Sequence, residues 1–198
     1  MFETYTASVR SYAMSKMTND NMEFKTMLVD MLCSGAAAQK NFGYNTGDLA
    51  DCQLTSEQLS WGSQAKAMEN YQVKGEFYQG TRLVLESRIQ MQVAFSGIAK
   101  GMYAIYTYTN HYGIQKTQRV EFEDMIAVGN GIYGISLDQL VVADARQVVT
   151  VIVYTADGHV YGGAVDSIES YCQRSSIFMP LALDLMRFSD SAYAYFHD

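Results

Sequence analysis

Charged residues are scarce in this 198-residue chain, at 18%, and it has one proline, one tryptophan and three cysteines. Its 14 basic residues face 21 acidic ones, which gives a net charge of −7 without any run of Lys or Arg. Nucleic acids and anionic membrane surfaces are bound by clustered basic side chains. The composition therefore argues against both partners.

Long apolar runs are also missing. No stretch of about 18 apolar residues, the length of a bilayer span, occurs in the sequence. The opening stretch "MFETYTASVR" lacks the charged segment and apolar core of a signal peptide. We expect no membrane insertion, and we expect the chain to be one module of a larger protein.

The three cysteines, Cys33, Cys52 and Cys172, match no C-x-x-C or zinc spacing. Cys33 and Cys52 are the pair expected to bridge if the protein has a disulfide, because Cys52 follows shortly after the helix that carries Cys33. The favoured expectation is three buried thiols.

Motifs for catalysis and for metals are absent from the sequence. The histidines, His111, His159 and His197, fit no triad or zinc pattern, so each is expected as a solvated surface residue. The segment "TGDLADCQ" has two carboxylates, fewer than a calcium loop uses. The loop aspartates are expected to form turns or caps; they are Asp48, Asp51, Asp138, Asp144 and Asp157. We expect no cofactor, no metal and no enzymatic activity.

The spacing of apolar residues along the sequence divides the chain into four segments. A helical period, with apolar residues three and four apart, predicts an N-terminal helical hairpin over 1–44. A polar connector with a short helix follows over 45–80. Over 81–163 apolar and polar residues alternate, which predicts β-strands. Asn130-Gly131 and Asp157-Gly158 in this segment favour tight type I′ hairpins. Helical spacing returns over 164–198.

This pattern predicts an α+β fold. Six to eight short strands at this spacing are typical of an antiparallel, immunoglobulin-like β-sandwich. We expect the sandwich to be flanked by N- and C-terminal helical hairpins that pack together, within one compact module.

The two helical ends resemble each other in sequence. When "SVRSYAMSKM…FKTMLVDMLCSGAAAQKNF" is laid over "SIESYCQRSS…FMPLALDLMRFSDSAYAYF", Tyr12 aligns with Tyr171 and Phe42 with Phe196. The overlay also matches Asp30 with Asp184 and Ala38 with Ala192. We expect the two tyrosines to anchor the core and the two phenylalanines to close the helix ends.

The stretch "GAAAQKNFGYNTG" (35–47) looks at first like a phosphate loop. Its small residues, however, lie at the C-terminal end of a helix, where the helix dipole repels anions. We interpret Gly35 and Ala38 as a surface that lets a neighbouring backbone approach closely. Gly43 is the expected stop residue, because glycine adopts a left-handed conformation at low cost.

Tyrosine is the one residue in surplus, at 15 copies. Strand alternation sends some tyrosines of the β segment outward, and an exposed tyrosine is a large, rigid contact residue. The candidate binding residues are Tyr103, Tyr106, Tyr108, Tyr112 and Tyr154. The alternative is that these tyrosines replace β-branched residues on half-buried strand faces.

The runs "YTASVRSY" and "LVDMLCSGAAAQKNFGYNTGDLA", with "LVLESRI" in the β region, resemble a repeated module of large secreted or surface-anchored proteins from Gram-positive gut anaerobes. The chain departs from that module at Cys33-Ser34, where the family carries Asn-Tyr. The resemblance implies an extracellular or cell-wall-attached location.

Three functions are consistent with this setting. The first is binding of a host or matrix protein, with immunoglobulin as one candidate, or adhesion. The alternatives are a carbohydrate-binding accessory module and a structural spacer. A carbohydrate site needs two or more coplanar rings, whereas a protein-binding site needs a contiguous exposed apolar patch.

Overall fold

The computed structural model describes residues 8–85, 89–175 and 179–197. It divides the chain into two compact units, which we call the helical unit (residues 8–66 and 179–197) and the β unit (residues 67–175). No helix in these residues is both long and apolar enough to cross a membrane.

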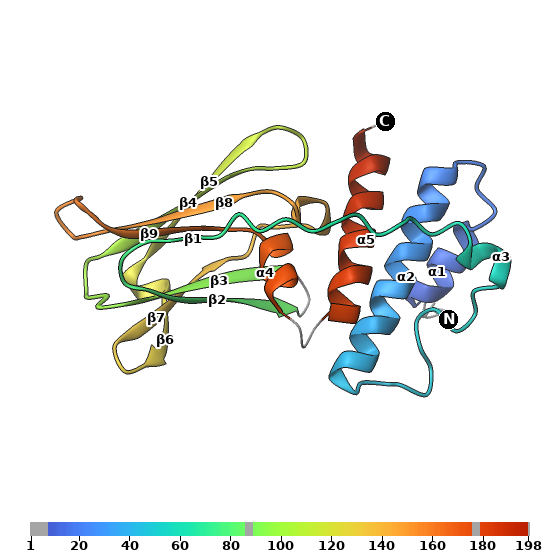
Figure 1. The fold of residues 1–198 in the computed structure, drawn as a ribbon, viewed down its shortest axis with the longest axis horizontal. Helices are drawn as coiled ribbons and strands as arrows, with labels where there is room; N and C mark the ends of the chain where they lie inside the picture. The colour runs from blue at the N-terminus through green and yellow to red at the C-terminus, as the bar shows by residue number, and fades with distance from the viewer. Residues whose placement is uncertain (1–7, 86–88, 176–178, 198) are drawn as a thin grey trace, which may run out of the picture. The chain divides into compact units, whose positions relative to one another are not determined.

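The helical unit contains four helices: α1 (Val9–Lys16), α2 (Met22–Phe42), α3 (Ser56–Leu59) and α5 (Met179–His197). The long helices α2 and α5 pack side by side (Figure 1). The side chain of Asn21 caps the start of α2 by accepting a hydrogen bond from the Phe24 N–H. At its end Gly43 has a φ of 64°, and the Tyr44 N–H donates to the Gln39 carbonyl at 3.0 Å. This pattern is a Schellman ending, which requires a left-handed residue.

A buried ion pair joins the two long helices. Asp30 on α2 is fully buried, and Arg187 Nη2 on α5 lies 3.2 Å from its Oδ1 atom. Ser63 of the connector donates its N–H to the same carboxylate at 3.1 Å and accepts a hydrogen bond from Arg187 Nε at 2.8 Å. Arg187 also pairs with Asp184 at 3.1 Å. The two aspartates matched in the sequence overlay therefore share one arginine.

Three of the four aromatic residues expected to anchor or close the helices lie instead on the surface, whereas Tyr171 is half-buried. Tyr12, Phe42 and Phe196 are each about half exposed or more, at 56%, 58% and 49%. The short helix α1 buries only its Ala13 face, so Tyr12 points outward, where Lys16 Nζ lies 5.5 Å from its ring. Phe42 is the last residue of α2, six positions beyond Ala36, the last buried residue of that helix.

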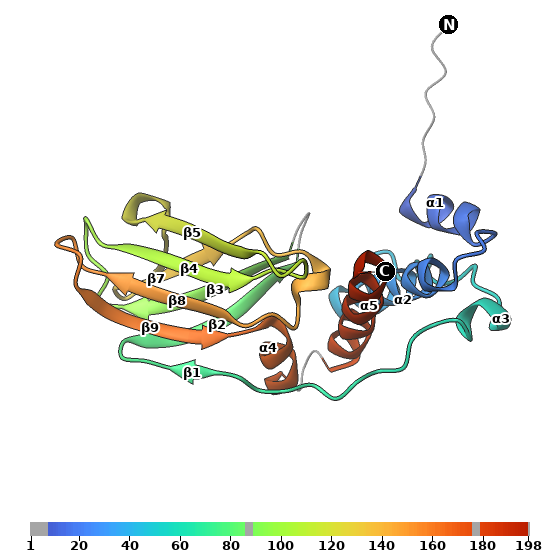
Figure 2. The same ribbon diagram turned by 90° about the horizontal axis from the view of Figure 1, so that it is seen from above.

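The β unit contains two antiparallel sheets (Figure 2). The five-stranded sheet has the order β1-β9-β8-β4-β5, and the four-stranded sheet has the order β2-β3-β7-β6. The strands of the first are β1 (Val73–Lys74), β9 (Val160–Asp166), β8 (Val149–Tyr154), β4 (Tyr103–Thr109) and β5 (Gln115–Glu121). Those of the second are β2 (Tyr78–Leu85), β3 (Ile89–Ser96), β7 (Ile132–Leu137) and β6 (Ile126–Gly129). The predicted sandwich with flanking helices is confirmed.

The core of the β unit lies between these sheets, because alternate residues of each strand face inward. Fully buried side chains come from β3 and β7 on one side and from β4 and β8 on the other; they include Met91, Val93, Phe95, Ile135, Leu137, Tyr106, Val151 and Val153. The strand β8 is the middle strand of its sheet, because it lies between β9 and β4.

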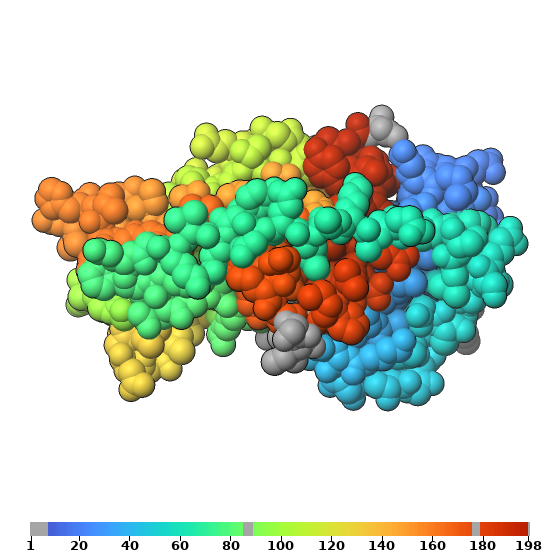
Figure 3. Space-filling view, in the orientation of Figure 1, coloured from blue at the N-terminus to red at the C-terminus, as the bar shows by residue number. Residues whose placement is uncertain are grey.

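Two predicted tight turns and one helix complete the β unit. At Asp157-Gly158 only Gly158 has a positive φ, 87°, so the prediction of a type I′ turn is wrong there. Asn130 and Gly131 both have positive φ, 52° and 71°, as the predicted type I′ hairpin requires. The β6–β7 hairpin that they close forms a knob on the surface of the unit (Figure 3). The helix α4 (Ile168–Arg174) belongs to the β unit, whereas α5 belongs to the helical unit, so the predicted segment 164–198 contributes to both.

The Gly35 position yields a test of the close-approach interpretation. A Cβ atom at Gly35 would lie 3.2 Å from the Cβ of Ala50, a tight contact between α2 and the connector. We expect Gly35→Leu to destabilise the helical unit by about 1–3 kcal/mol through overpacking. Urea unfolding followed by helical circular dichroism measures this change.

The matched control is Gly47→Leu, because a Cβ atom at Gly47 meets nothing within 4 Å. We expect that variant to unfold like the parent protein. Equal stability of the two variants would contradict the close-approach interpretation.

Candidate functional site

The outer face of the five-stranded sheet carries a matched set of side chains. In the register of β4 with β8, Tyr103 is opposite Tyr154, Ile105 is opposite Ile152, and Thr107 is opposite Thr150. All six side chains are half-buried, and their even-numbered neighbours on β4 face the core. We call these six residues the paired face. Cross-strand pairs of this kind stabilise a sheet and also fix the positions of its outward side chains.

The tyrosine pair is held rigidly at one end of the paired face. The rings of Tyr103 and Tyr154 are stacked, with centroids 5.1 Å apart and planes 12° from parallel. The guanidinium of Arg119, on β5, lies 3.5 Å from the Tyr103 centroid, an attractive cation–π distance. Arg119 is itself oriented by Glu121, whose Oε1 accepts its Nε–H at 2.5 Å. The same hydrogen bond lowers the pKa of the Glu121 carboxyl, so the pair is charged at neutral pH.

The paired face is open within the β unit. Figure 2 views this sheet from outside, and no helix among the described residues of the unit crosses it. The neighbouring strand β5 extends the face with Thr117 and Arg119. The result is a sheet surface of aromatic, β-branched and hydroxyl groups, with one arginine at its border.

The five predicted tyrosines separate into three groups. The structure brings Tyr103 and Tyr154 together on the paired face. Tyr112 is 56% exposed but lies in the β4–β5 turn, against the ring of His111. Tyr106 and Tyr108, at 0% and 5% exposure, face the core and cannot contact a partner.

The inward tyrosine Tyr106 connects the two sheets, and Tyr108 connects β4 to the loop that follows β7. Tyr106 donates its hydroxyl hydrogen to the Ile135 carbonyl at 2.5 Å, and Tyr108 donates to the Gln139 carbonyl at 3.3 Å. Burial raises the pKa of the Tyr106 hydroxyl far above its usual value, so it remains a donor. Strand alternation could have assigned these tyrosines inward, because they share the parity of Ala104. Sequence reasoning missed Arg119, whose position over Tyr103 depends on the β4–β5 register.

The expectation of a solvated His111 is wrong. Its side chain is 9% exposed, and its Nδ1 atom lies 2.7 Å from Asp144 Oδ1. The backbone N–H of His111 donates to the same oxygen at 2.8 Å, and the Val141 N–H donates to Asp144 Oδ2 at 3.3 Å. Asp144 therefore holds the β4–β5 turn against the loop that follows β7. His159, in contrast, is 83% exposed.

The cysteines are free thiols in three environments. Cys33 is half-buried, Cys52 is exposed and Cys172 is buried, so there is no bridge between Cys33 and Cys52. Burial raises the pKa of Cys33 to about 11 and likewise raises the pKa of Cys172 to about 11. Cys52 lies 3.3 Å from Arg10 Nη1, beside the Arg10–Asp48 ion pair. The expectation of three buried thiols therefore fails at Cys52.

No cluster of three or more His, Cys, Asp or Glu side chains suited to a metal occurs among the residues that the structure describes. Comparison with protein-family models, with curated proteins and with solved structures finds no match. The paired face is thus assessed on its own geometry, which offers van der Waals contact, hydroxyl hydrogen bonds and one cation.

Removing the hydroxyl oxygen of Tyr106 tests whether its hydrogen bond to the other sheet stabilises the protein. We expect Tyr106→Phe to lower the free energy of unfolding by about 1 kcal/mol, the net value of one hydrogen bond. Tyr154→Phe is the matched control, because its ring lies on the outer face, and we expect it to change stability by less than about 0.5 kcal/mol. Denaturant unfolding followed by tyrosine fluorescence measures both. Equal effects would contradict the role of Tyr106 as the connection between the sheets.

The cysteine environments predict an order of alkylation. Because the thiolate is the reactive form, a pKa near 11 leaves about one thiol in a thousand ionised at pH 8. We expect iodoacetamide to label Cys52 first in the native protein, and Cys33 and Cys172 far more slowly. Raising the pH toward 11 should speed labelling of Cys33. Peptide mass spectrometry over a time course resolves the three sites, and first labelling at Cys172 would contradict the assignment.

Proposed function

We propose that this chain is a non-enzymatic protein-binding module of a bacterial surface protein and that its paired face contacts a host or matrix protein. The observation that carries this proposal is the rigid Tyr103–Tyr154 stack, held by Arg119 on an open sheet face. The extracellular or wall-attached location rests on the resemblance of the "GAAAQKNFGYNT" region to repeats of such proteins.

The chemistry of the paired face suits a protein partner. Tyrosine and arginine are enriched among the residues that dominate binding energy at protein interfaces. A side chain that is already packed loses little conformational entropy on binding, and the Tyr103 ring packs against both Tyr154 and the Arg119 guanidinium. An open sheet face also suits another protein better than a small ligand, which is usually bound in a concave pocket.

The alternatives are supported less well. A sugar ring stacks on an exposed aromatic face, but the two faces of Tyr103 are occupied by Tyr154 and Arg119. Rings 5.1 Å apart are too close to lie side by side in one plane, so they form no platform for a glycan. A structural spacer would need no such ordered face. Immunoglobulin is one candidate among host proteins and is included in the test.

The test is capture of a partner from serum and from mucus extract, with a glycan array run in parallel. We expect the parent protein to capture a defined protein and Tyr103→Ala/Tyr154→Ala to bind it about 100-fold more weakly, because truncation of a dominant contact costs about 2 kcal/mol or more. Affinity for the captured protein and for purified immunoglobulin is measured by surface plasmon resonance.

The control variant is Tyr12→Ala, which removes a tyrosine that is 56% exposed in the helical unit. We expect it to bind like the parent protein, and thermal unfolding shows whether each variant is folded. A glycan signal without protein capture would favour the carbohydrate alternative. Absence of both protein capture and glycan binding would favour the structural spacer.

A further inference from the structure

We infer that a small pocket on the outer face of the four-stranded sheet binds a carboxylate that is carried on a short apolar chain. We call it the Arg82 pocket. It measures about 180 Å³, and its lining residues are Gly80, Thr81, Arg82, Gln92, Ala94, Val128 and Gly134. This inference rests on β2, β3, β6 and β7 and is independent of the paired face, which belongs to the other sheet.

Gln92 positions the guanidinium of Arg82 at this pocket. Arg82 on β2 is opposite Gln92 on β3, and its Nε–H donates to Gln92 Oε1 at 2.6 Å. Gln92 is itself only 6% exposed, so the acceptor has a fixed place in the sheet. A guanidinium has five N–H donors, and this hydrogen bond uses one of them. The planar edge formed by Nη1 and Nη2 therefore still has its donors.

Arg82 differs from the other arginines that the structure describes, because it forms no ion pair with a described carboxylate. Each of the others is paired with a carboxylate of its own unit; they are Arg10, Arg119, Arg146, Arg174 and Arg187. The chain has 21 acidic residues for 14 basic ones, so an arginine without a carboxylate partner is unexpected. The charge of Arg82 is thus available to an anion from outside the chain.

The strand register brings the apolar part of the pocket together beside Arg82. Gly80 is opposite Ala94, and Ala94 is in turn opposite Gly134 on β7. Ala94 and Gly134 face outward, because their sequence neighbours on both strands point into the core. Three adjacent strands therefore carry nothing larger than a methyl group at this level, which leaves a hollow in the sheet surface.

Val128 and Gln92 border this hollow. A Cβ atom at Gly134 would lie 3.6 Å from Val128 Cγ2 and 3.9 Å from Gln92 Oε1. The second atom is the oxygen that accepts the hydrogen bond from Arg82 Nε. The guanidinium and the apolar surface of the pocket thus meet at Gln92, and one ligand can contact both.

The chemistry of the lining selects a carboxylate. Of the lining residues only Arg82 is charged, so the pocket favours an anion. Two parallel hydrogen bonds from a guanidinium match the planar geometry of a carboxylate. A phosphate brings more charge and more acceptor oxygens than a single arginine satisfies. A carboxylate leaves the rest of its ligand free to contact Ala94 and Val128.

The size of the pocket limits the ligand to one short chain. Pockets for drug-sized molecules measure roughly 300–1,000 Å³, and this one is smaller. A glutamate side chain of a partner protein and a free short-chain carboxylic acid share the required chemistry, because both carry a carboxylate on a few methylene groups.

The test is a nuclear magnetic resonance titration of the full chain with sodium butyrate at constant ionic strength. The control ligand is butyramide, which has the same carbon chain without the charge. We expect saturable shifts of the Ala94 and Gly134 amides in the millimolar range with butyrate only, weakened by added salt. Equal shifts with butyramide, or no saturation with butyrate, would overturn the inference. Tighter binding of methyl phosphate than of butyrate would overturn the selection of a carboxylate.

Three variants sharpen the result. We expect Arg82→Gln to weaken binding about tenfold, because the charged hydrogen bonds are lost. Gly134→Ala should weaken it about tenfold, because the added methyl group occupies space that the ligand needs and so removes its van der Waals contacts. That methyl group makes only ordinary contacts with the protein, at 3.6 Å or more, so we expect the variant to fold. Lys74→Gln, which removes an exposed lysine from β1 of the other sheet, should change nothing.

Thermal unfolding shows whether each variant is folded. Arg82 is exposed, so Arg82→Gln decides the matter if Gly134→Ala fails to fold. Equal weakening by Arg82→Gln and Lys74→Gln would indicate a general attraction of anions and would overturn the assignment to this pocket.

A final comparison separates the two sources of the carboxylate. Butyrate and the peptide acetyl-Gly-Gly-Glu-Gly-Gly-amide are titrated side by side, with the glutamine form of the peptide as control. Tighter binding of the glutamate peptide supports an acidic side chain of a partner protein, and butyrate binding at least as tight supports a site for free acids. Binding of the glutamine peptide as tightly as the glutamate peptide would contradict the carboxylate assignment.

Discussion

The hydrogen bond from the Tyr106 hydroxyl to the Ile135 carbonyl is the constraint on which the arrangement of the β unit depends. It joins β4 of one sheet to β7 of the other through a side chain that is fully buried. Because side chains alternate along a strand, placing Tyr106 inside places Tyr103 and Ile105 outside. The register of β4 with β8 then sets each outward residue of β4 opposite a residue of the same type on β8. A one-residue slip would bury the Tyr103 ring and expose Tyr106, so the core and the paired face are determined together.

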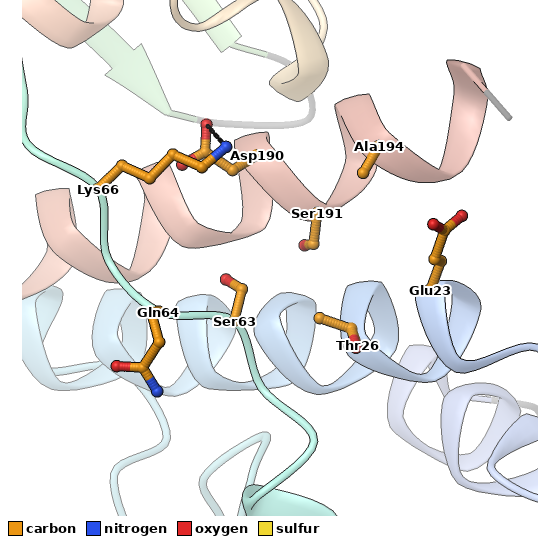
Figure 4. A pocket seen from close by; sticks show the side chains of 8 residues that line it. All are labelled: Glu23, Thr26, Ser63, Gln64, Lys66, Asp190, Ser191 and Ala194. Carbon is orange, nitrogen blue, oxygen red and sulfur yellow. Dashed lines mark ion pairs between the residues drawn. The ribbon is translucent and has the colours of Figure 1, made fainter.

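The helical unit depends on a different kind of constraint, a buried charge. Asp30 has no access to water, and an unpaired carboxylate in that place would be very costly. Arg187 and the Ser63 N–H satisfy it, and in doing so they fix both the spacing of α2 and α5 and the path of the connector beside them. The same connector supplies Ser63 and Lys66 to a pocket that residues of α2 and α5 also line (Figure 4). The pocket is therefore a consequence of how this carboxylate is neutralised, because the segment that satisfies Asp30 is the segment that lines the cavity.

The fold could be predicted from the spacing of apolar residues in the sequence. There are physical reasons why this worked for the strands and turns and failed for individual side chains. Alternation and turn residues reveal a strand wherever one face is buried, so β8, the Asn130-Gly131 hairpin and the Gly43 helix end could all be assigned locally. Burial of a single side chain depends on neighbours that are distant in sequence. His111 was misassigned because Asp144, 33 residues away, brings it inside. Tyr12 and Phe42 were misassigned because the overlay of the two helical ends compares sequence and carries no information on which helix face meets a neighbour. For the candidate site, the surplus of tyrosine in the composition was enough to propose five tyrosines as binding residues. Only the strand register shows that Tyr103 and Tyr154 are the two that lie together on the paired face.

The scarcity of charge determines the physical character of the paired face. Most of the buried carboxylates are matched by an arginine within the same unit: Arg187 with Asp30, Arg174 with Asp166 and Arg146 with Glu169. These ion pairs hold parts of the fold together, and because their opposite charges cancel they contribute little to the electrostatic potential at the surface. On the paired face Arg119 is neutralised by Glu121, so contact there depends on apolar area and ring packing, which salt screens weakly.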